Sequence, residues 1–469
     1  MAHPLRLRTI AALGCAAALT AAGASSAQAG TTYLPLELAK LTNEKYGKDC
    51  FWAPPKGMDY ARLPNTIPIQ TPNLYPDVGS TYFVGQYKLP AGAKLTFRGR
   101  FPHERYFSFT IFKSLTGGQI GPGDSLRDEN IVPDEGSVNP FVATNRRDAK
   151  RRNYTVHVVG GPIPEQRAQN TLYTGSTDPN QRVGMSIRNY LPDKGLDGTG
   201  GVGLPKLTLT LADGTELQGE EACALLDPIE DKSTATFPME QWKSLVAASP
   251  DPANMPAVKT PVWQRFWNAA YSVAGAFILD PAERARVFEP KDEGGFQSNP
   301  DTRYMTLPVS LNFGKVITVS GKLPTFPRTL PASKTWKPRN WQVRYWSLCT
   351  GSSPVSGKGF DCVYDAQVPL GPNRSYTLVV SRPEDRPRNA RPACGYRWLA
   401  FGNGEDYPDP AARDWVDTLY VRYMAPSPTF THAPVNVKTP GTEAQVMGPY
   451  MPKSKYWSKA QFEKLGCKR

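Results

Sequence analysis

The sequence of 469 residues predicts a mainly β fold that consists of two tandem, duplicated modules of the β-sandwich or jelly-roll type. Apolar residues alternate in short runs, and Gly, Pro, Asp or Asn bounds each run, as is typical of strands joined by turns. The same motifs also occur twice, in the same order. We expect a helical connector between the modules and short terminal helices.

Four pairs of segments define the repeat. Residues 95–102 (LTFRGRFP) match 317–324 (ITVSGKLP), 105–110 (RYFSFT) match 344–349 (RYWSLC), 154–159 (YTVHVV) match 376–380 (YTLVV), and 187–192 (IRNYLP) match 421–426 (VRYMAP). Solenoid repeats span roughly 20–50 residues, so a repeat this long indicates two complete modules.

Module one is expected over residues 30–228 and module two over residues 296–469, each large enough for its own core. Runs rich in β-branched and aromatic residues predict strands in both modules. These runs are residues 82–87, 94–99, 106–112 and 154–159, and residues 305–311, 316–320, 343–348 and 417–423.

The connector, residues 229–295, should be helical and packed against a module. Helical spacing marks residues 240–248 and 262–277, and the latter segment would present one apolar face. Terminal helices are expected at residues 36–45 and after Ser458, which forms a capping box with Gln461.

Residues 1–29 have the form of a secretory signal peptide. A short basic region precedes an Ala/Leu-rich stretch, and Ala27-Gln28-Ala29 supplies the small residues that precede cleavage before Gly30. Cys15 raises a lipoprotein alternative, although the residues before it fit a lipobox poorly. No later segment is apolar enough to be a transmembrane segment. We therefore expect a secreted or cell-envelope protein.

The other six cysteines form an even set, which predicts three disulfides in an exported chain. Their positions favour the pairs Cys50–Cys223, Cys349–Cys362 and Cys394–Cys467 among the fifteen formal pairings. None has the CxxC spacing of zinc or redox sites.

The formal charge is +13, and it falls to +11 when Arg6 and Arg8 of the signal peptide are removed. This excess favours an anionic envelope polymer or an acidic glycan as partner. Nucleic acid is not expected as a partner, because the chain is exported and lacks a recognisable binding motif. The oligomeric state is left open.

Residues 298–304 (SNPDTRY), 314–324 (GKVITVSGKLP) and 344–347 (RYWS) together resemble a bacterial pattern. It is similar to that of the domains of unknown function numbered twelve fifty-four and twelve fourteen. Module one departs from the pattern at residues 73–82 (NLYPDVGSTY). The resemblance implies a β-sandwich fold and no particular activity.

The densest acidic cluster includes Asp124, Asp128, Glu129 and Asp134 on a segment rich in Gly and Pro. Irregular oxygen ligands of this kind suit calcium, although the spacing matches no EF-hand loop. A solvated turn is the alternative interpretation. In module two, Asp365 stands at the place of Asp128 and the other acids are missing. No other cofactor is expected.

Arginines occupy equivalent places in the two modules: Arg105 and Arg344, and Arg188 and Arg422. If they line a cleft, their guanidinium groups could bind a carboxylate or sulfate group bidentately. Alternatively, they pair with buried acids and hold the fold together.

Six tryptophans fall in module two and only Trp52 in module one. Trp336 and Trp341 lie on a loop rich in Pro and Lys, where exposed rings could stack on a sugar. Packing in the core is the commoner use of such rings.

The sequence contains no motif that identifies a catalysed reaction. The chain has no HExxH and no Gly-x-Ser-x-Gly, and the glycines of residues 198–203 precede a strand where a dinucleotide site needs a helix. We expect an exported non-catalytic binding or structural protein, acting on an acidic or carbohydrate envelope ligand. The alternative is a secreted hydrolase with a carboxylate pair in a cleft between the modules. The residues that line such a cleft would distinguish the two.

Overall fold

The computed structural model of the protein describes residues 50–52, 56–57, 75–77, 79–114, 120–228, 256–329, 341–352, 357–402 and 416–467. The predicted signal peptide, the predicted helices at 36–45 and 240–248, and Trp336 lie outside these residues. Within the described ranges, no helix is both long and apolar enough to cross a membrane.

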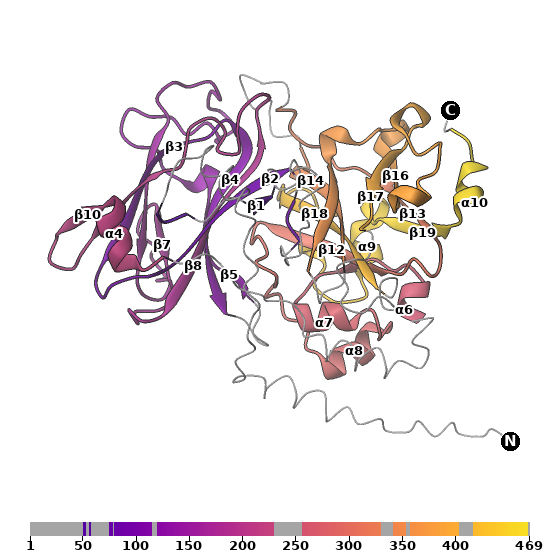
Figure 1. The fold of residues 1–469 in the computed structure, drawn as a ribbon, viewed down its shortest axis with the longest axis horizontal. Helices are drawn as coiled ribbons and strands as arrows, with labels where there is room; N and C mark the ends of the chain where they lie inside the picture. Colours follow the sequence, from indigo (N-terminus) through magenta and orange to yellow (C-terminus); the bar gives the residue numbers. More distant parts are fainter. Residues whose placement is uncertain are drawn as a thin grey trace.

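The fold is mainly β, as predicted, and module one contains two sheets (Figure 1). The first sheet has the order β1 (Lys56–Gly57), β2 (Ser80–Lys88), β8 (Arg182–Pro192), β4 (Glu104–Ser114) and β5 (Ile120–Arg127). The second has the order β10 (Glu216–Gln218), β9 (Lys206–Thr210), β3 (Lys94–Arg100), β6 (Asn153–Val159) and β7 (Thr171–Tyr173).

Module two also contains two sheets. The first has the order β11 (Gln264–Arg265), β12 (Thr302–Val309), β18 (Asp417–Pro426), β14 (Val343–Gly351) and β15 (Gly359–Tyr364). The second has the order β17 (Arg397–Ala400), β16 (Ser375–Ser381), β13 (Val316–Lys322) and β19 (Lys453–Trp457). All eight strands predicted from the alternating runs are present, with boundaries that shift by a few residues.

The strand order of the two modules corresponds at every matched segment. The paired motifs lie on β3 and β13, β4 and β14, β6 and β16, and β8 and β18. Both modules also contain one parallel pair, β6 with β7 and β16 with β17.

Glycine is present in both copies of one motif because a tyrosine lies over it. Gly99 pairs with Tyr154 across β3 and β6, and Gly321 pairs with Tyr376 across β13 and β16. A Cβ atom at Gly99 would lie 2.6 Å from the Tyr154 hydroxyl oxygen, and one at Gly321 would lie 3.0 Å from that of Tyr376. A larger residue would displace either ring from its core.

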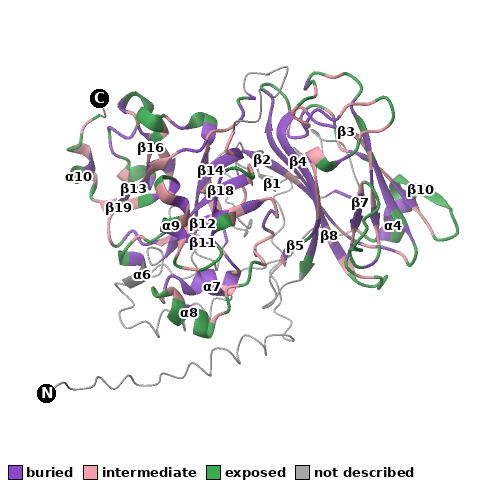
Figure 2. Ribbon diagram, turned by 180° about the vertical axis from the view of Figure 1, so that it is seen from behind, coloured by how far each residue is buried: buried purple, intermediate pink, exposed green. Residues whose placement is uncertain are grey.

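Each core lies between the two sheets of its module. On β8, Val183, Met185 and Ile187 point into the module one core, and on β18 Leu419 and Val421 do the same in module two. Side chains alternate along a strand, so the residues between them face the other module. Among these are residues 186, 188 and 190 on β8 and residues 420, 422 and 424 on β18. All six are buried where the modules meet. Figure 2 shows that this contact region is largely buried.

The connector packs on module two, but its helices are shorter than predicted. Residues 262–277 were expected as one helix, whereas Gln264–Arg265 forms β11 and only Ala269–Ala274 forms helix α7. Pairing of β11 with β12 takes the first half into the sheet. Trp263, Trp267 and Tyr271 still lie in the module two core, so the predicted docking is confirmed.

The remaining helices are short and lie at the ends of the sheets. They are α4 (Gly219–Leu226), α6 (Pro256–Lys259), α8 (Pro281–Val287), α9 (Glu443–Met447) and α10 (Lys459–Glu463). The capping box at Ser458 is confirmed, since its side chain accepts from the Gln461 backbone N–H and opens α10.

Three disulfides join the cysteines in the expected pairs. Cys50–Cys223 links the segment before β1 to helix α4, and Cys349–Cys362 joins the neighbouring strands β14 and β15. Cys394–Cys467 ties the C-terminal segment to module two.

Glu104, the first residue of β4, is a buried acid with an unusual environment. It is 1% exposed, and neither carboxylate oxygen has a hydrogen-bond partner within the described ranges. Burial raises the pKa of Glu104 well above its usual value, and Asp128 and Asp193 raise it further. At the equivalent position of module two, β14 begins with the apolar residue Val343.

We predict that Glu104→Gln becomes increasingly stabilising, relative to the unmodified protein, as the pH rises above about 4.3, the usual pKa of an unfolded Glu. Below that pH both states bind the proton. Above it the unfolded chain releases the proton while folded Glu104 retains it, so the unmodified protein loses up to about 1.4 kcal/mol per pH unit until the folded pKa is reached. Urea unfolding between pH 4.5 and 8 measures the difference. Exposed Glu135→Gln is the control, and a difference that does not change with pH would contradict the prediction.

Candidate functional site

Two reciprocal ion pairs join the modules. Arg105 of β4 donates from Nη1 to both carboxylate oxygens of Asp365, at 2.6 and 2.7 Å. Arg344 of β14 donates from Nη1 to Oδ1 of Asp128 at 2.5 Å. All four residues are buried. The two arginines occupy equivalent positions, as do the two aspartates, so each module supplies one cation and one anion to the other.

Each aspartate is also held by the strand beside it. The Phe107 backbone N–H donates to Asp128 Oδ2 at 2.8 Å, and the Trp346 N–H donates to Asp365 Oδ2 at 3.0 Å. Phe107 and Trp346 lie two residues after the arginine of their own strand. Each aspartate is therefore held by a backbone N–H of its own module as well as by the arginine of the other.

A second reciprocal contact joins tyrosines to aspartates. The Tyr106 hydroxyl donates to Asp301 Oδ2 at 2.7 Å, and the Tyr345 hydroxyl donates to Asp77 Oδ1 at 2.7 Å. Asp77 and Asp301 each follow a proline and lie just before β2 and β12. Tyr106 and Tyr345 also share one hydrophobic cluster with Tyr190, Leu191 and Met424. Sequence reasoning missed Asp77 and Asp301.

The predicted calcium ligands do not come together. Asp124 binds Arg167 at 2.7 and 2.8 Å, Asp128 binds Arg344, and Glu129 binds Arg344 at 2.9 Å. No group of three closely spaced ligand side chains includes these residues or Asp134 within the described ranges. The carboxylates of three of them are occupied by guanidinium groups, an arrangement that favours a structural role.

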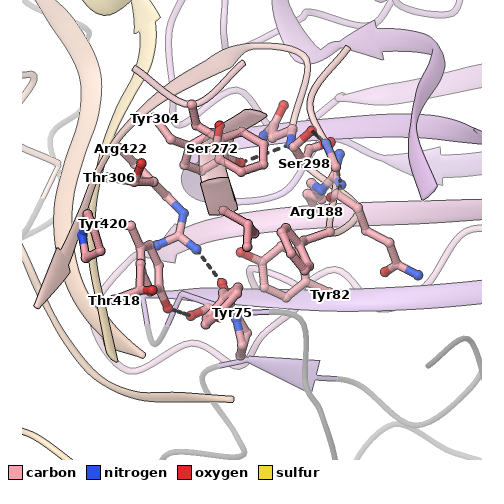
Figure 3. A pocket seen from close by; sticks show the side chains of 18 of the residues that line it. Tyr75, Tyr82, Arg188, Ser272, Ser298, Tyr304, Thr306, Thr418, Tyr420 and Arg422 are labelled. Atoms are coloured by element: carbon pink, nitrogen blue, oxygen red, sulfur yellow. Dashed lines mark hydrogen bonds between the residues drawn. The ribbon is translucent and has the colours of Figure 1, made fainter. Parts of the chain in front are cut away.

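A cavity lies between the modules (Figure 3). Its volume is about 140 Å³. The outward faces of β2 and β8 form one wall, and those of β12 and β18 form the other. Residues 75–76, helix α7 and residues 295–299 complete it.

The cavity has an aromatic and aliphatic lining with polar groups at intervals. Tyr82 and Val84 come from β2, Tyr304 and Thr306 from β12, and Phe266 and Val273 from the connector segment, so all three parts of the chain contribute. Tyr82 and Tyr190 share a hydrogen bond of 2.8 Å between their hydroxyl groups. Burial raises the pKa of both, which keeps them neutral.

The charged groups of the lining are two arginines, Arg188 and Arg422. They occupy equivalent positions, opposite Tyr82 and Tyr304 in the strand register. Of the four arginines that the sequence offered for a cleft, these two line the cavity. No Asp or Glu belongs to the described lining.

The two arginines have different partners. Arg422 lies 3.1 Å from Asp77 Oδ2 and donates to the Tyr75 carbonyl at 2.6 Å. Burial lowers the pKa of Arg422, but Asp77 together with Tyr82, Tyr420 and Tyr190 raises it more, so the net pKa lies well above its ordinary value. Arg188 donates to the Thr110 hydroxyl at 2.8 Å and to the carbonyls of Gln297 and Ser298 at 2.6 and 3.4 Å.

Arg105, Arg344 and Trp341 are not placed for ligand binding. The two arginines are engaged by acids of the other module, which is the alternative that the sequence left open. Trp341 was expected on an exposed loop, but it is half-buried and packs against the module one core. Trp341 belongs to module two, so its ring contributes to the contact between the modules.

Comparisons with known proteins add little. No protein-family model matches the chain, and no curated protein matches it. The chain is similar to the crystal structure of an uncharacterised protein from Burkholderia cenocepacia, with 11% identity, a TM-score of 0.43 and coverage of 96% of this chain and 95% of that one. A protein from Vibrio parahaemolyticus has 11% identity, a TM-score of 0.35 and coverage of 90% and 96%. Scores this low carry no argument, so the family resemblance stays a prediction.

We predict that Arg105→Met lowers the free energy of unfolding by about 3–5 kcal/mol, because Asp365 is left buried and unpaired. Adding Asp365→Leu should restore most of this loss, since both charges are then gone. Urea unfolding measures both effects. Arg146→Met is the control, because Arg146 lies in an exposed pair and its loss should not move the unfolding midpoint. A single variant as stable as the unmodified protein would show that the pair does not hold the modules together.

Proposed function

We propose that this protein is an exported, non-catalytic binding protein and that it takes a small ligand into the cavity between its modules. The observation that supports this most directly is the cavity itself. It combines a mostly apolar lining with a few fixed polar groups, as small-molecule sites do.

The contact between the modules favours a preformed site. Two residues of its lining make buried contacts with the other module: Arg422 pairs with Asp77, and Asn299 accepts a hydrogen bond from Tyr106. A site that is already ordered loses less conformational entropy when a ligand binds.

The hydrolase alternative has less support. It needs two carboxyl groups on opposite sides of a scissile bond. The described lining of the cavity contains no carboxyl group, and Glu104 is buried without belonging to that lining.

Export is supported by the form of residues 1–29 and by the disulfides. Disulfides persist in oxidising compartments and are rare in the cytosol. We therefore place the protein outside the cytoplasm, either secreted or in the cell envelope.

A ligand screen tests the proposal. Thermal unfolding is followed with a library of small metabolites and glycan fragments, using the unmodified protein and Thr306→Trp, which fills the cavity from β12. A ligand at a hundred times its Kd should stabilise the unmodified protein by about 2.7 kcal/mol and leave the filled variant unaffected. Thr155→Trp, on the second sheet of module one, is the control and should respond like the unmodified protein. If no compound distinguishes Thr306→Trp from the control, the cavity is not a binding site.

A further inference from the structure

Arg188 is a buried cation whose partners are all neutral. It is 2% exposed, and its hydrogen bonds go to one hydroxyl and two backbone carbonyls. Within the described ranges no carboxylate forms an ion pair with it. Burying a charge is costly unless an opposite charge accompanies it.

The other module shows how such an arginine is neutralised. Arg422, at the equivalent position, pairs with Asp77. The counterpart of Asp77 is Asp301, which accepts instead from the Tyr106 hydroxyl and lies 3.5 Å from Arg127. The pseudosymmetry therefore fails at Arg188, where the equivalent carboxylate is bound elsewhere.

Two hydroxyl groups of the cavity lining are also left without partners. Ser186 precedes Arg188 by two residues, so both side chains lie on the same face of β8. The Oγ of Ser186 and the Oγ1 of Thr306 are buried, and among the residues that the structure describes neither has a hydrogen-bond partner. Ser186 is itself 1% exposed. A ligand with acceptor atoms would supply what both groups lack.

The volume and the lining limit the ligand. About 140 Å³ is room for roughly ten water molecules, since each needs about 10–15 Å³ on this measure. Much of the lining near the arginines is apolar or aromatic, including Val84, Pro308 and Tyr304. A polymer does not fit in this volume, whereas a compact acid with an apolar body does.

We propose that the cavity binds a small organic monocarboxylate, whose anionic group pairs with Arg188 while its apolar body lies between the two walls. The inference rests on the proposed function and makes it more specific. Of the acidic and carbohydrate ligands considered from the sequence, it selects the acidic one and places its charge in the module one half of the cavity.

Matched pairs of ligands test the charge requirement. Calorimetric titration compares benzoate with benzamide, and hexanoate with hexanamide, on the unmodified full chain. A charge-assisted hydrogen bond is worth about 1.5–3 kcal/mol, so each acid should bind roughly 10- to 100-fold more tightly than its amide. Inorganic sulfate is included to separate a general anion site from one that also needs an apolar body, and it should bind more weakly than either acid.

A pair of variants tests the role of Arg188 without removing it. Ser186→Asp places a carboxylate on the same face of β8 and should neutralise Arg188, which abolishes the preference for acid over amide. Ser186→Asn has almost the same shape and no charge, so it should alter both affinities alike and keep their ratio. Thermal unfolding of both variants shows that they are folded, and Ser186→Asp should be the more stable of the two.

The outcomes separate the two proposals. If acid and amide bind equally and Thr306→Trp prevents both from binding, the cavity is a binding site but its assigned charge preference is wrong. If the ratio survives in Ser186→Asp, Arg188 does not carry the preference. If neither acids nor amides bind the unmodified protein, the monocarboxylate assignment fails, and the metabolite screen separately decides whether the cavity binds anything.

Discussion

The exchange of one buried arginine and one buried aspartate between the modules is the constraint on which the rest of the structure depends. Arg105 and Arg344 could not remain buried without Asp365 and Asp128, and each aspartate is fixed by a backbone N–H of its own module. An interface in which each side supplies the same groups to the other is what two-fold symmetry produces in a homodimer. Here both sides belong to one chain, so the contact is intramolecular and does not depend on protein concentration.

This arrangement explains why a cavity persists beside the contact. Side chains on β4 and β14 meet directly, through Tyr106 and Tyr345, whereas β2 and β12 are covered by the connector and by residues 75–76. Ser186 and Thr306, two small residues, lie on opposite walls of the cavity. Arg188 lies on the same wall as Ser186, and within the described part of the chain its hydrogen bonds go to neutral groups.

Much of the fold could be predicted from sequence, because alternation and turn residues are local signals. The strands and the capping box at Ser458 were of this kind, whereas the disulfide pairs followed from the even number of cysteines and their positions in the modules. Helix α7 was predicted too long, since the helical spacing of Trp263 and Trp267 is also compatible with entry into a sheet edge, and only β12 decides between the two. The interface between the modules was harder to predict from sequence. Its one sequence signal was that Asp128 and Asp365, like Arg105 and Arg344, occupy equivalent places in both copies.

The acids of module one show why shared and unshared residues need different interpretations. Asp128 was grouped with Asp124 and Glu129 as a metal ligand because the three are close in sequence, but Asp128 and its counterpart Asp365 each bind an arginine of the other module. A residue that recurs in both modules belongs first to the frame that both need. By the same argument, a residue that recurs in both modules but has different partners in each indicates a difference in function between them. Arg188 and Arg422 recur, Asp77 and Asp301 recur, and yet only Arg422 is paired with its aspartate. That difference cannot be read from residue identities, because it depends on which way Asp301 turns once the modules have met.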